Sequence, residues 1–189
     1  CSIVVLFKPK NGFLNYLKQQ TKNFKMVIII NNSPEIKTEI FQLERVKIIN
    51  NSKNLGLATA LNIGVNKAIS FGFEMVALFD QDTFIKDDFL EKMSLNYSLL
   101  ENKKNIALFA PMYFDLNTGE ENKHINFKYL NLIRTKADKS KIYHSPDYVI
   151  TSGSIITIAA YKEIGPFNNE MFIDFIDIEW CLRALRHHS

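Results

Sequence analysis

The stretch Met26-Val27-Ile28-Ile29-Ile30-Asn31-Asn32-Ser33 places a continuous apolar run directly before three small polar residues. A strand with one face in water alternates apolar and polar residues, whereas a strand covered on both faces is apolar almost throughout. The stretch therefore predicts a strand inside a sheet that helices cover on both sides. In such sheets ligands bind beyond the carboxyl ends of the strands, so Asn31-Asn32-Ser33 occupies an expected ligand loop.

Similar short runs recur along the chain and alternate with segments of helical spacing. The strand-like runs are residues 3–7, 26–30, 46–49, 75–79 and 106–109, with a longer, interrupted one at 148–158. The helical segments are residues 13–20, 35–43, 57–71 and 87–100. This alternation predicts β-α-β units and a doubly wound α/β fold with a mainly parallel sheet.

The composition of the chain predicts one domain, residues 1–189. The 189 residues are 47% hydrophobic, which suffices for one sizeable core, and no linker or repeat divides them. A net charge of only +3 argues against a nucleic-acid binder, which needs a strongly basic face. No segment has the roughly 18–20 apolar residues of a membrane span.

The cysteines and the chain ends give two further expectations. Cys1 and Cys181 show neither metal-ligand nor disulfide-framework spacing, which favours a reducing compartment, and we expect a cytoplasmic protein. The chain starts without Met and stops at Ser189 within a helical pattern, so we expect that sequence is missing at its ends.

Two carboxylates follow the fourth apolar run, in Asp80-Gln81-Asp82-Thr83. Mg²⁺ and Mn²⁺ prefer oxygen ligands and commonly take one or two carboxylates, while water and substrate phosphates complete the shell. The spacing therefore predicts a divalent metal site at Asp80 and Asp82. The structural alternative is that Asp82 or Thr83 caps the next helix. A phosphotransferase of the haloacid-dehalogenase type is disfavoured, because its Asp-x-Asp lies near the start of the domain.

Asn54-Leu55-Gly56 opens the helical segment at residues 57–71. A glycine there lets backbone N–H groups and the helix N-terminus face an anion, which predicts contact with a nucleotide. Asn62, farther along the segment, could face the same ligand. The alternative is that Asn54 caps the helix and Asn62 lies on a polar face.

Near the C-terminus, Phe172-Ile173-Asp174-Phe175-Ile176-Asp177-Ile178-Glu179-Trp180 interleaves acids with large apolar residues. A carboxylate held beside apolar groups is a candidate general base. If a helix begins here, Asp174 and Asp177 share a face, and Glu179 can pair with Arg183. The alternative is that the acids stabilise the helix N-terminus.

Two stretches carry weaker signals. Thr151-Ser152-Gly153-Ser154 interrupts the last strand-like run, which suits close approach of a ligand or a bulge. From Met112 to Pro146 the alternation of strands and helices weakens, and within this insertion residues 123–141 contain six Lys or Arg and one acid, Asp138. We interpret this insertion as a basic surface that attracts an anionic acceptor or a phospholipid surface. His124 and His144 show no metal or nucleophile spacing and are expected at the surface.

These pieces together resemble glycosyltransferase family 2, the inverting GT-A type, and most closely its rhamnosyltransferase branch. The resemblance rests on residues 4–5, 30–33, 54–64, 79–83 and 152–154, and above all on residues 172–183, which are similar to the branch's FIDxxDxEWCLR segment. It implies a GT-A fold. It also implies sugar transfer from dTDP-L-rhamnose or a UDP-sugar to a glycan or lipid-linked acceptor in cell-surface polysaccharide synthesis.

The resemblance also implies roles for individual residues. Asp82 is the principal metal ligand, Asp80 contacts the ribose or the metal side, and Asp177 is the catalytic base, with Asp174 as the alternative. The residues expected around the donor nucleotide are Asn31, Asn54, Gly56 and Asn62. The family usually has Asp at the position of Asn31 and often Glu-Asp where Ile176-Asp177 stands, which leaves the base specificity and the general base open.

Two rival functions remain on the sequence alone. A non-catalytic nucleotide-sugar binding module would bind the donor without transfer or hydrolysis. A nucleotidyltransferase of related architecture needs a Gly-rich, Arg-containing phosphate loop, which residues 7–12 lack. Family members tend to continue past Arg186 with elements that complete the acceptor site or tether the enzyme to a membrane, here expected at its inner face.

Overall fold

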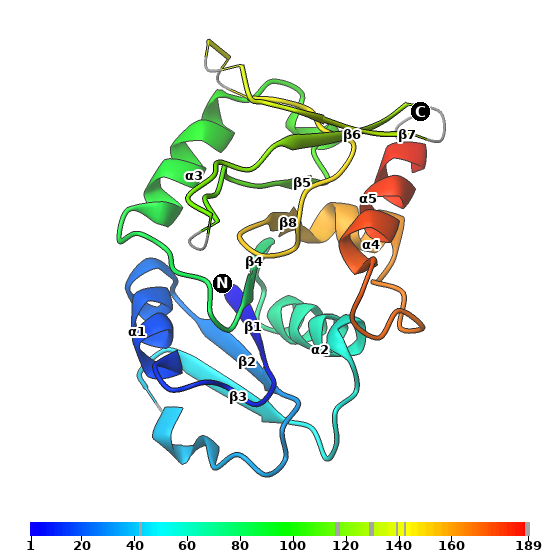
Figure 1. The fold of residues 1–189 in the computed structure, drawn as a ribbon. Helices are drawn as coiled ribbons and strands as arrows, with labels where there is room; N and C mark the ends of the chain where they lie inside the picture. The colour runs from blue at the N-terminus through cyan, green and yellow to red at the C-terminus, as the bar shows by residue number, and fades with distance from the viewer. Residues whose placement is uncertain (42, 116–117, 129–130, 139, 142, 188–189) are drawn as a thin grey trace.

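The computed structural model describes residues 1–41, 43–115, 118–128, 131–138, 140–141 and 143–187. Within these residues a six-stranded sheet has the order β3-β2-β1-β4-β8-β5 (Figure 1). Four strands are parallel, namely β1 (Ser2–Leu6), β2 (Val27–Asn31), β3 (Val46–Asn50) and β4 (Met75–Asp80). At one edge β8 (Ile155–Thr157) and β5 (Leu108–Phe109) add antiparallel pairs. The predicted α/β fold with a mainly parallel sheet is confirmed.

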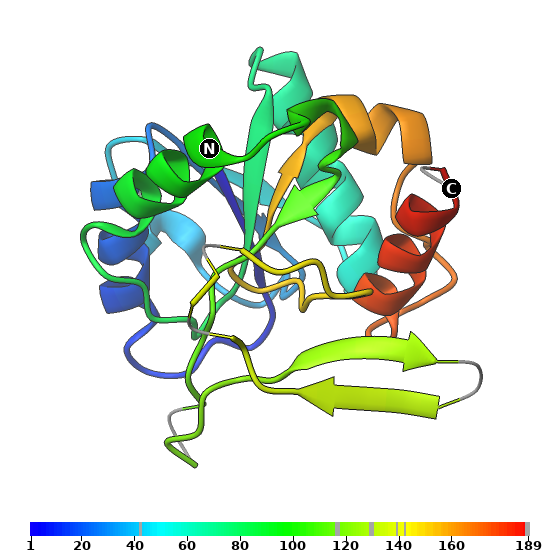
Figure 2. The ribbon, with the colours of Figure 1, turned by 90° about the horizontal axis from the view of Figure 1, so that it is seen from above.

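Helices cover both faces of this sheet (Figures 1 and 2). One face carries α1 (Phe13–Asn23) and α3 (Phe89–Leu99), and the other carries α2 (Leu57–Ser70), α4 (Ile158–Ile164) and α5 (Ile176–His187). Alternate residues of β2 divide between two hydrophobic clusters, with Ile28 on the α2 side and Ile29 on the α1 side. Burial on both faces explains the continuous apolar run at residues 26–30.

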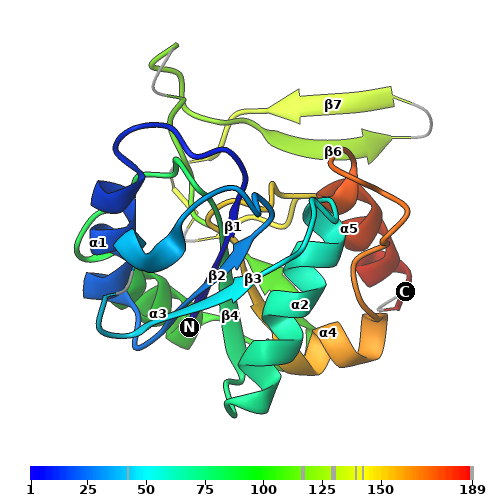
Figure 3. The same ribbon diagram turned by 90° about the horizontal axis from the view of Figure 1, so that it is seen from below.

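The register of the parallel strands brings polar residues to one edge. Leu6 of β1 pairs with Asn31, Asn31 pairs with Asn50, and Val5 pairs with Asp80. Asn31, Asn50 and Asp80 therefore lie together at the carboxyl edge of the sheet. A separate antiparallel hairpin, β6 (His124–Lys128) and β7 (Asn131–Thr135), lies beyond this edge (Figures 2 and 3).

Two predicted elements are wrong in extent. In the described part of residues 35–43, the Ile36 N–H donates to the Ser33 carbonyl at 2.9 Å in a turn, and the helical structure that follows is the 3₁₀ turn η1 (Thr38–Phe41). Residues 148–158 are a strand only at β8, after which Thr157 caps α4 by accepting the Ala160 N–H at 3.1 Å. A second 3₁₀ turn, η2, covers Lys103–Asn105. In the described residues, no helix is long and apolar enough to cross a membrane.

Candidate active site

The loop after β4 carries Asp80, Gln81 and Asp82 at the carboxyl edge of the sheet. The Gln81 amide bonds twice with the backbone of Phe7: its Oε1 accepts the Phe7 N–H at 2.9 Å and its Nε2 donates to the Phe7 carbonyl at 3.0 Å. The residue between the two acids thus ties this loop to the end of β1. Gln81 holds both carboxylates in place, a role that the sequence did not reveal.

Residues 151–154 support the same loop from the other side. Ser152 Oγ accepts the Asp80 N–H at 3.0 Å and lies 2.5 Å from Thr83 Oγ1. Gly153, with a φ of 86°, donates its N–H to the Leu78 carbonyl at 2.7 Å. The interruption in the strand-like run is therefore a turn that packs against the end of β4 and positions Asp80.

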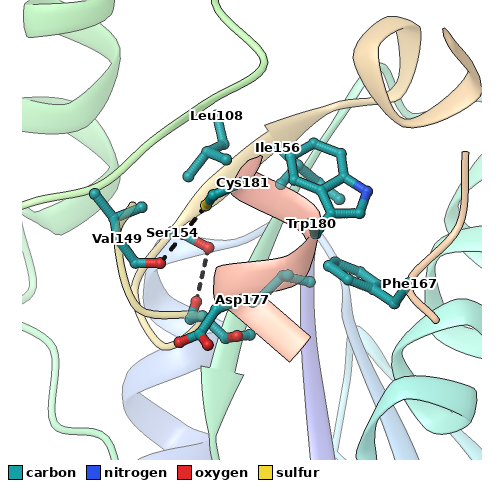
Figure 4. A pocket seen from close by; sticks show the side chains of 10 residues that line it. Leu108, Val149, Ser154, Ile156, Phe167, Asp177, Trp180 and Cys181 are labelled. Atoms are coloured by element: carbon teal, nitrogen blue, oxygen red, sulfur yellow. Dashed lines mark hydrogen bonds between the residues drawn. The ribbon is translucent and has the colours of Figure 1, made fainter. Parts of the chain in front are cut away.

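Asp177 reaches this edge from the first turn of α5. Its Oδ1 accepts the Ile178 N–H at 2.9 Å. The residue also forms one wall of a small pocket, with Thr151, Val149 and Trp180, that has room for about one water molecule (Figure 4). Asp177 is half-buried, so its carboxylate combines a partly apolar setting with access to solvent.

The carboxylates of Asp82 and Asp177 lie close enough to Asp80 to affect its pKa. The pKa of Asp80 is raised, first by the protein that desolvates it and then by the charges of Asp82 and Asp177, although the residue stays open to solvent. Burial also raises the pKa of Asp177, against the lowering effect of backbone N–H groups including that of Thr151. Among the described residues no Lys or Arg forms an ion pair with these three carboxylates.

A divalent cation fits the chemistry of this donor set. In the described part of the chain, no group of three or more His, Cys, Asp or Glu side chains could enclose a metal ion. Mg²⁺ and Mn²⁺ do not need such a cage, because they retain waters and bind substrate phosphates beside one or two carboxylates. Asp80 and Asp82 would hold the ion from the protein side, and it would offset the like charges that raise the pKa of Asp80.

Asn31 and Asn32 join the loops that follow β2 and β3. The buried Asn31 donates from Nδ2 to Asn50 Oδ1 at 3.0 Å, and its Oδ1 accepts the Ser33 N–H at 3.0 Å. Asn32 accepts from Asn51 Nδ2 at 2.7 Å and donates to the Gly56 carbonyl at 3.1 Å. Other groups of the protein thus hydrogen-bond to the Asn31 side chain. Contact between Asn31 and a donor nucleotide stays a prediction.

The Asn62 side chain makes four hydrogen bonds within the protein. Its Oδ1 accepts from the Tyr161 hydroxyl at 2.8 Å and from the Phe167 N–H at 2.9 Å. Its Nδ2 donates to the Phe167 carbonyl at 2.8 Å and to Asn169 Oδ1 at 2.9 Å. This buried amide has both acceptor positions and both donors in use within the protein, and the expectation that Asn62 lines the donor pocket stays a prediction.

The backbone of residues 166–175, here called the strap, covers the N-terminus of α2. The Leu57 N–H donates to the Phe172 carbonyl at 2.6 Å, and Asn54 Oδ1 accepts the Gly56 N–H at 2.9 Å. A Cβ at Gly56, where φ is 82°, would lie 2.7 Å from the Phe172 carbonyl oxygen. Gly56 therefore allows the close approach of the strap, and Asn54 stabilises the turn, while the expected contact of these residues with an anion stays a prediction.

The segment around α5 corrects one expectation and confirms another. Asp174 is exposed in the strap, and Phe175 has a left-handed φ of 64°, so Asp174 does not share a helix face with Asp177. The predicted pair is present, since Arg183 Nη2 donates to Glu179 Oε2 at 2.9 Å. Arg183 also donates to the Ile164 carbonyl at 2.8 Å, which anchors α5 and so positions Asp177.

Two tyrosines near Asp177 were not identified from the sequence. Burial is the first cause that raises the pKa of Tyr113 and of Tyr148, and the Asp177 carboxylate contributes to both shifts. The Tyr148 ring also lies 6.4 Å from the Phe127 ring of β6. These tyrosines come from opposite ends of the insertion, so no local motif marks them and only the fold brings both toward Asp177.

The model of the family described as glycosyl transferase family 2 matches residues 12–165. The chain belongs to glycosyltransferase family 2. The matched part of this family 2 chain contains Asp80, Asp82 and the supporting residues 151–154, and it ends before the strap and Asp177.

Curated relatives of this family 2 chain include a dTDP-rhamnosyl transferase, RfbF, from Shigella flexneri. The two are 29% identical over 193 residues, which cover 98% of this chain and 63% of the relative. An uncharacterized glycosyltransferase from Haemophilus influenzae is 34% identical over 93 residues, or 47% of this chain and 36% of that protein. The chain thus spans less than two thirds of the length of either relative.

A solved structure confirms the predicted GT-A fold. The crystal structure of GalNAc-T7 with UDP, GalNAc and Mn²⁺ superimposes with a TM-score of 0.69 and 12% sequence identity. The match covers 97% of this family 2 chain and 39% of the GalNAc-T7 chain. At this identity the likeness concerns the fold alone.

Proposed function

We propose that residues 1–189 form the catalytic domain of an inverting glycosyltransferase that uses a nucleotide-diphosphate sugar. One observation carries this proposal: Asp80 and Asp82 at the end of β4 and Asp177 in the first turn of α5 lie at the carboxyl edge of the sheet, close enough that the charges of Asp82 and Asp177 raise the pKa of Asp80. Two of the carboxylates can bind a metal ion, whose charge stabilises a leaving group. The third, which is half-buried, can act as the base, and a displacement reaction needs both.

The donor side of the proposal concerns the end of β4. Asp82 and Asp80 would bind Mn²⁺ or Mg²⁺, held in place by Gln81 and Ser152. The bound ion supplies positive charge to the departing diphosphate. We propose dTDP-L-rhamnose as the donor, because of the similarity to the rhamnosyl transferase of Shigella flexneri. A UDP-sugar is the alternative, since the structurally similar GalNAc-T7 crystallised with UDP.

The acceptor side concerns Asp177. Its carboxylate takes the proton of the acceptor hydroxyl while the oxygen forms a bond to the anomeric carbon. The bond between that carbon and the diphosphate oxygen breaks with its electron pair on the leaving group, so the configuration inverts. Burial raises the pKa of Asp177, which makes its carboxylate a stronger base than an exposed aspartate.

We propose a glycan or a lipid-linked glycan as the acceptor, within cell-surface polysaccharide synthesis. Lys128, Arg134, Lys136 and Lys141 lie on or next to the β6–β7 hairpin beyond the carboxyl edge of the sheet. Such positive charge attracts phosphate groups of a lipid carrier or of a membrane surface. We therefore propose a cytoplasmic domain that associates peripherally with the inner face of the membrane. Lys139, which belongs to the same basic stretch, lies outside the described residues.

Replacement of the base tests this mechanism. Asp177→Asn should lower transfer, and the slow hydrolysis of dTDP-L-rhamnose, by about 10²-fold or more, while dTDP binding is retained. The matched control is Asp174→Asn, which removes an exposed carboxylate three positions earlier. Loss of activity in Asp174→Asn with near-normal activity in Asp177→Asn would transfer the role to Asp174.

A further inference from the structure

A second cavity lies away from Asp177, on the β6–β7 hairpin. Its volume is about 140 Å³, whereas the pocket beside Asp177 holds about one water molecule. One wall is the face of the hairpin, where His124 pairs with Thr135, and the facing wall is the segment that follows β7. The residues that line it include His124, Asn126, Thr135, Lys136, Asp138 and His144.

The walls of this cavity offer hydrogen-bonding groups of both kinds. Asn126 has an amide and Thr135 a hydroxyl, and each can donate and accept. The His124 and His144 rings lie 4.3 Å apart at an interplanar angle of 35° and both line the cavity. His124 Nε2 is buried and has no hydrogen-bond partner in the described part of the chain.

The charges around the cavity favour an uncharged ligand over an anion. Lys136 contributes one positive charge and Asp138 one negative charge to the lining. Burial, and then the neighbouring His144, lower the pKa of His124, which disfavours its charged form. The Asp138 carboxylate, held by the Ser140 N–H at 3.0 Å and by its hydroxyl at 2.6 Å, would repel a phosphate.

The hairpin is tied to the segment that leads to the base. The Phe127 N–H donates to Asp147 Oδ2 at 2.6 Å, and the Asp147 N–H donates to the Ile125 carbonyl at 3.1 Å. A backbone bridge also joins Ile125 to Tyr148, whose pKa responds to Asp177. The cavity therefore belongs to the side of the molecule on which the acceptor meets Asp177.

We propose that this cavity is a subsite for one uncharged sugar residue of the acceptor glycan, a proposal that rests on the proposed transferase function. A sugar ring carries hydroxyls that both donate and accept, which matches Asn126 and Thr135. Its apolar C–H face can pack against an imidazole ring of His124 or His144. The subsite would select acceptor glycans by binding a sugar unit other than the one to which the new sugar is attached.

The test is an NMR titration of the whole chain that follows the ring signals of His124 and His144. The probes are L-rhamnose, D-glucose, D-galactose and N-acetyl-D-glucosamine, with inorganic phosphate as the anion. We expect saturable shifts with at least one sugar and none with phosphate. Asn126→Ala should weaken sugar binding about tenfold, whereas Asn131→Ala, on the exposed strand β7, should leave it unchanged.

Two results would overturn the subsite. Saturable shifts with phosphate in place of sugars would make the cavity an anion site, and no shift with any of the four sugars would remove it as a sugar site. Binding of dTDP with Mn²⁺ to the same sample reports on the proposed function separately. If dTDP binds normally but no sugar shifts the histidine signals, the subsite is contradicted and the proposed transferase function is not.

Discussion

At the residue scale, Asn62 acts as a support for the strap through its four hydrogen bonds. Removal of its amide would leave the Tyr161 hydroxyl and both backbone groups of Phe167 without partners in a buried setting. Unsatisfied buried groups cost more than the net gain from a hydrogen bond. This one side chain therefore connects the packing of α4 to the position of the strap beside Asp177.

We predict that Asn62→Ala lowers the free energy of unfolding by about 3 kcal/mol, because several buried polar groups lose their partner at once. Urea unfolding measures the change. Asn66→Ala, on the exposed side of the same helix, is the control and should change stability little. A stable Asn62→Ala variant with weakened dTDP binding would instead support a place for Asn62 in the donor pocket.

The raised pKa of Asp177 predicts the pH dependence of transfer. A general base acts when ionised, so activity should rise with pH through the pKa of Asp177 and fall below it. Burial raises that pKa, and the acidic limb of kcat/KM should lie above the ordinary aspartate value of about 3.9. The measurement is a pH profile at saturating Mn²⁺. An acidic limb at or below the ordinary value would contradict the assignment.

At the element scale, the strap and α2 share one contact that requires a glycine. The Phe172 carbonyl takes the first N–H of α2 and approaches Gly56 so closely that a side chain there would displace it. The sequence predicted that something approaches the backbone of Gly56 closely. It could not show whether this is a ligand or a distant segment of the same chain. Asn54 and Asn62 share this ambiguity, because a small polar residue suits either partner.

We predict that Gly56→Ala destabilises the chain more than Gly12→Ala does. Gly12 is left-handed helical, with φ 102° and ψ −8°, where a side chain costs about 1–2 kcal/mol. Gly56, with φ 82° and ψ 166°, lies in a region that essentially only glycine adopts, so its backbone cost is larger. Gly12 has open space around it, whereas a Cβ at Gly56 meets the Phe172 carbonyl oxygen at 2.7 Å. Urea unfolding of both variants gives the difference. Equal losses would contradict both the larger backbone cost and the clash with the strap at Gly56.

At the scale of the whole molecule, the first half of the fold could be predicted and much of the second could not. Apart from residues 35–43, where a 3₁₀ turn takes the place of the predicted helix, residues 1–80 form strands and helices in sequence order with apolar patterns visible in the sequence. The second half depends on contacts between distant segments, such as Ala77 with Ile155 and Asp80 with Ser152. Asp80, Asp82 and Asp177 followed from motifs, whereas Gln81, Ser152, Tyr113 and Tyr148 required the fold.

The most direct test of the central claim is calorimetric titration of the chain with dTDP and with UDP, each with and without Mn²⁺. We predict that dTDP binds more tightly than UDP, that binding requires Mn²⁺, and that Asp82→Ala abolishes the metal-dependent part. Asp87→Ala, which removes an exposed carboxylate paired with Lys22 at 3.2 Å, should bind as the wild type does. Binding that ignores Mn²⁺, or that survives Asp82→Ala unchanged, would contradict a metal-dependent donor site at the end of β4.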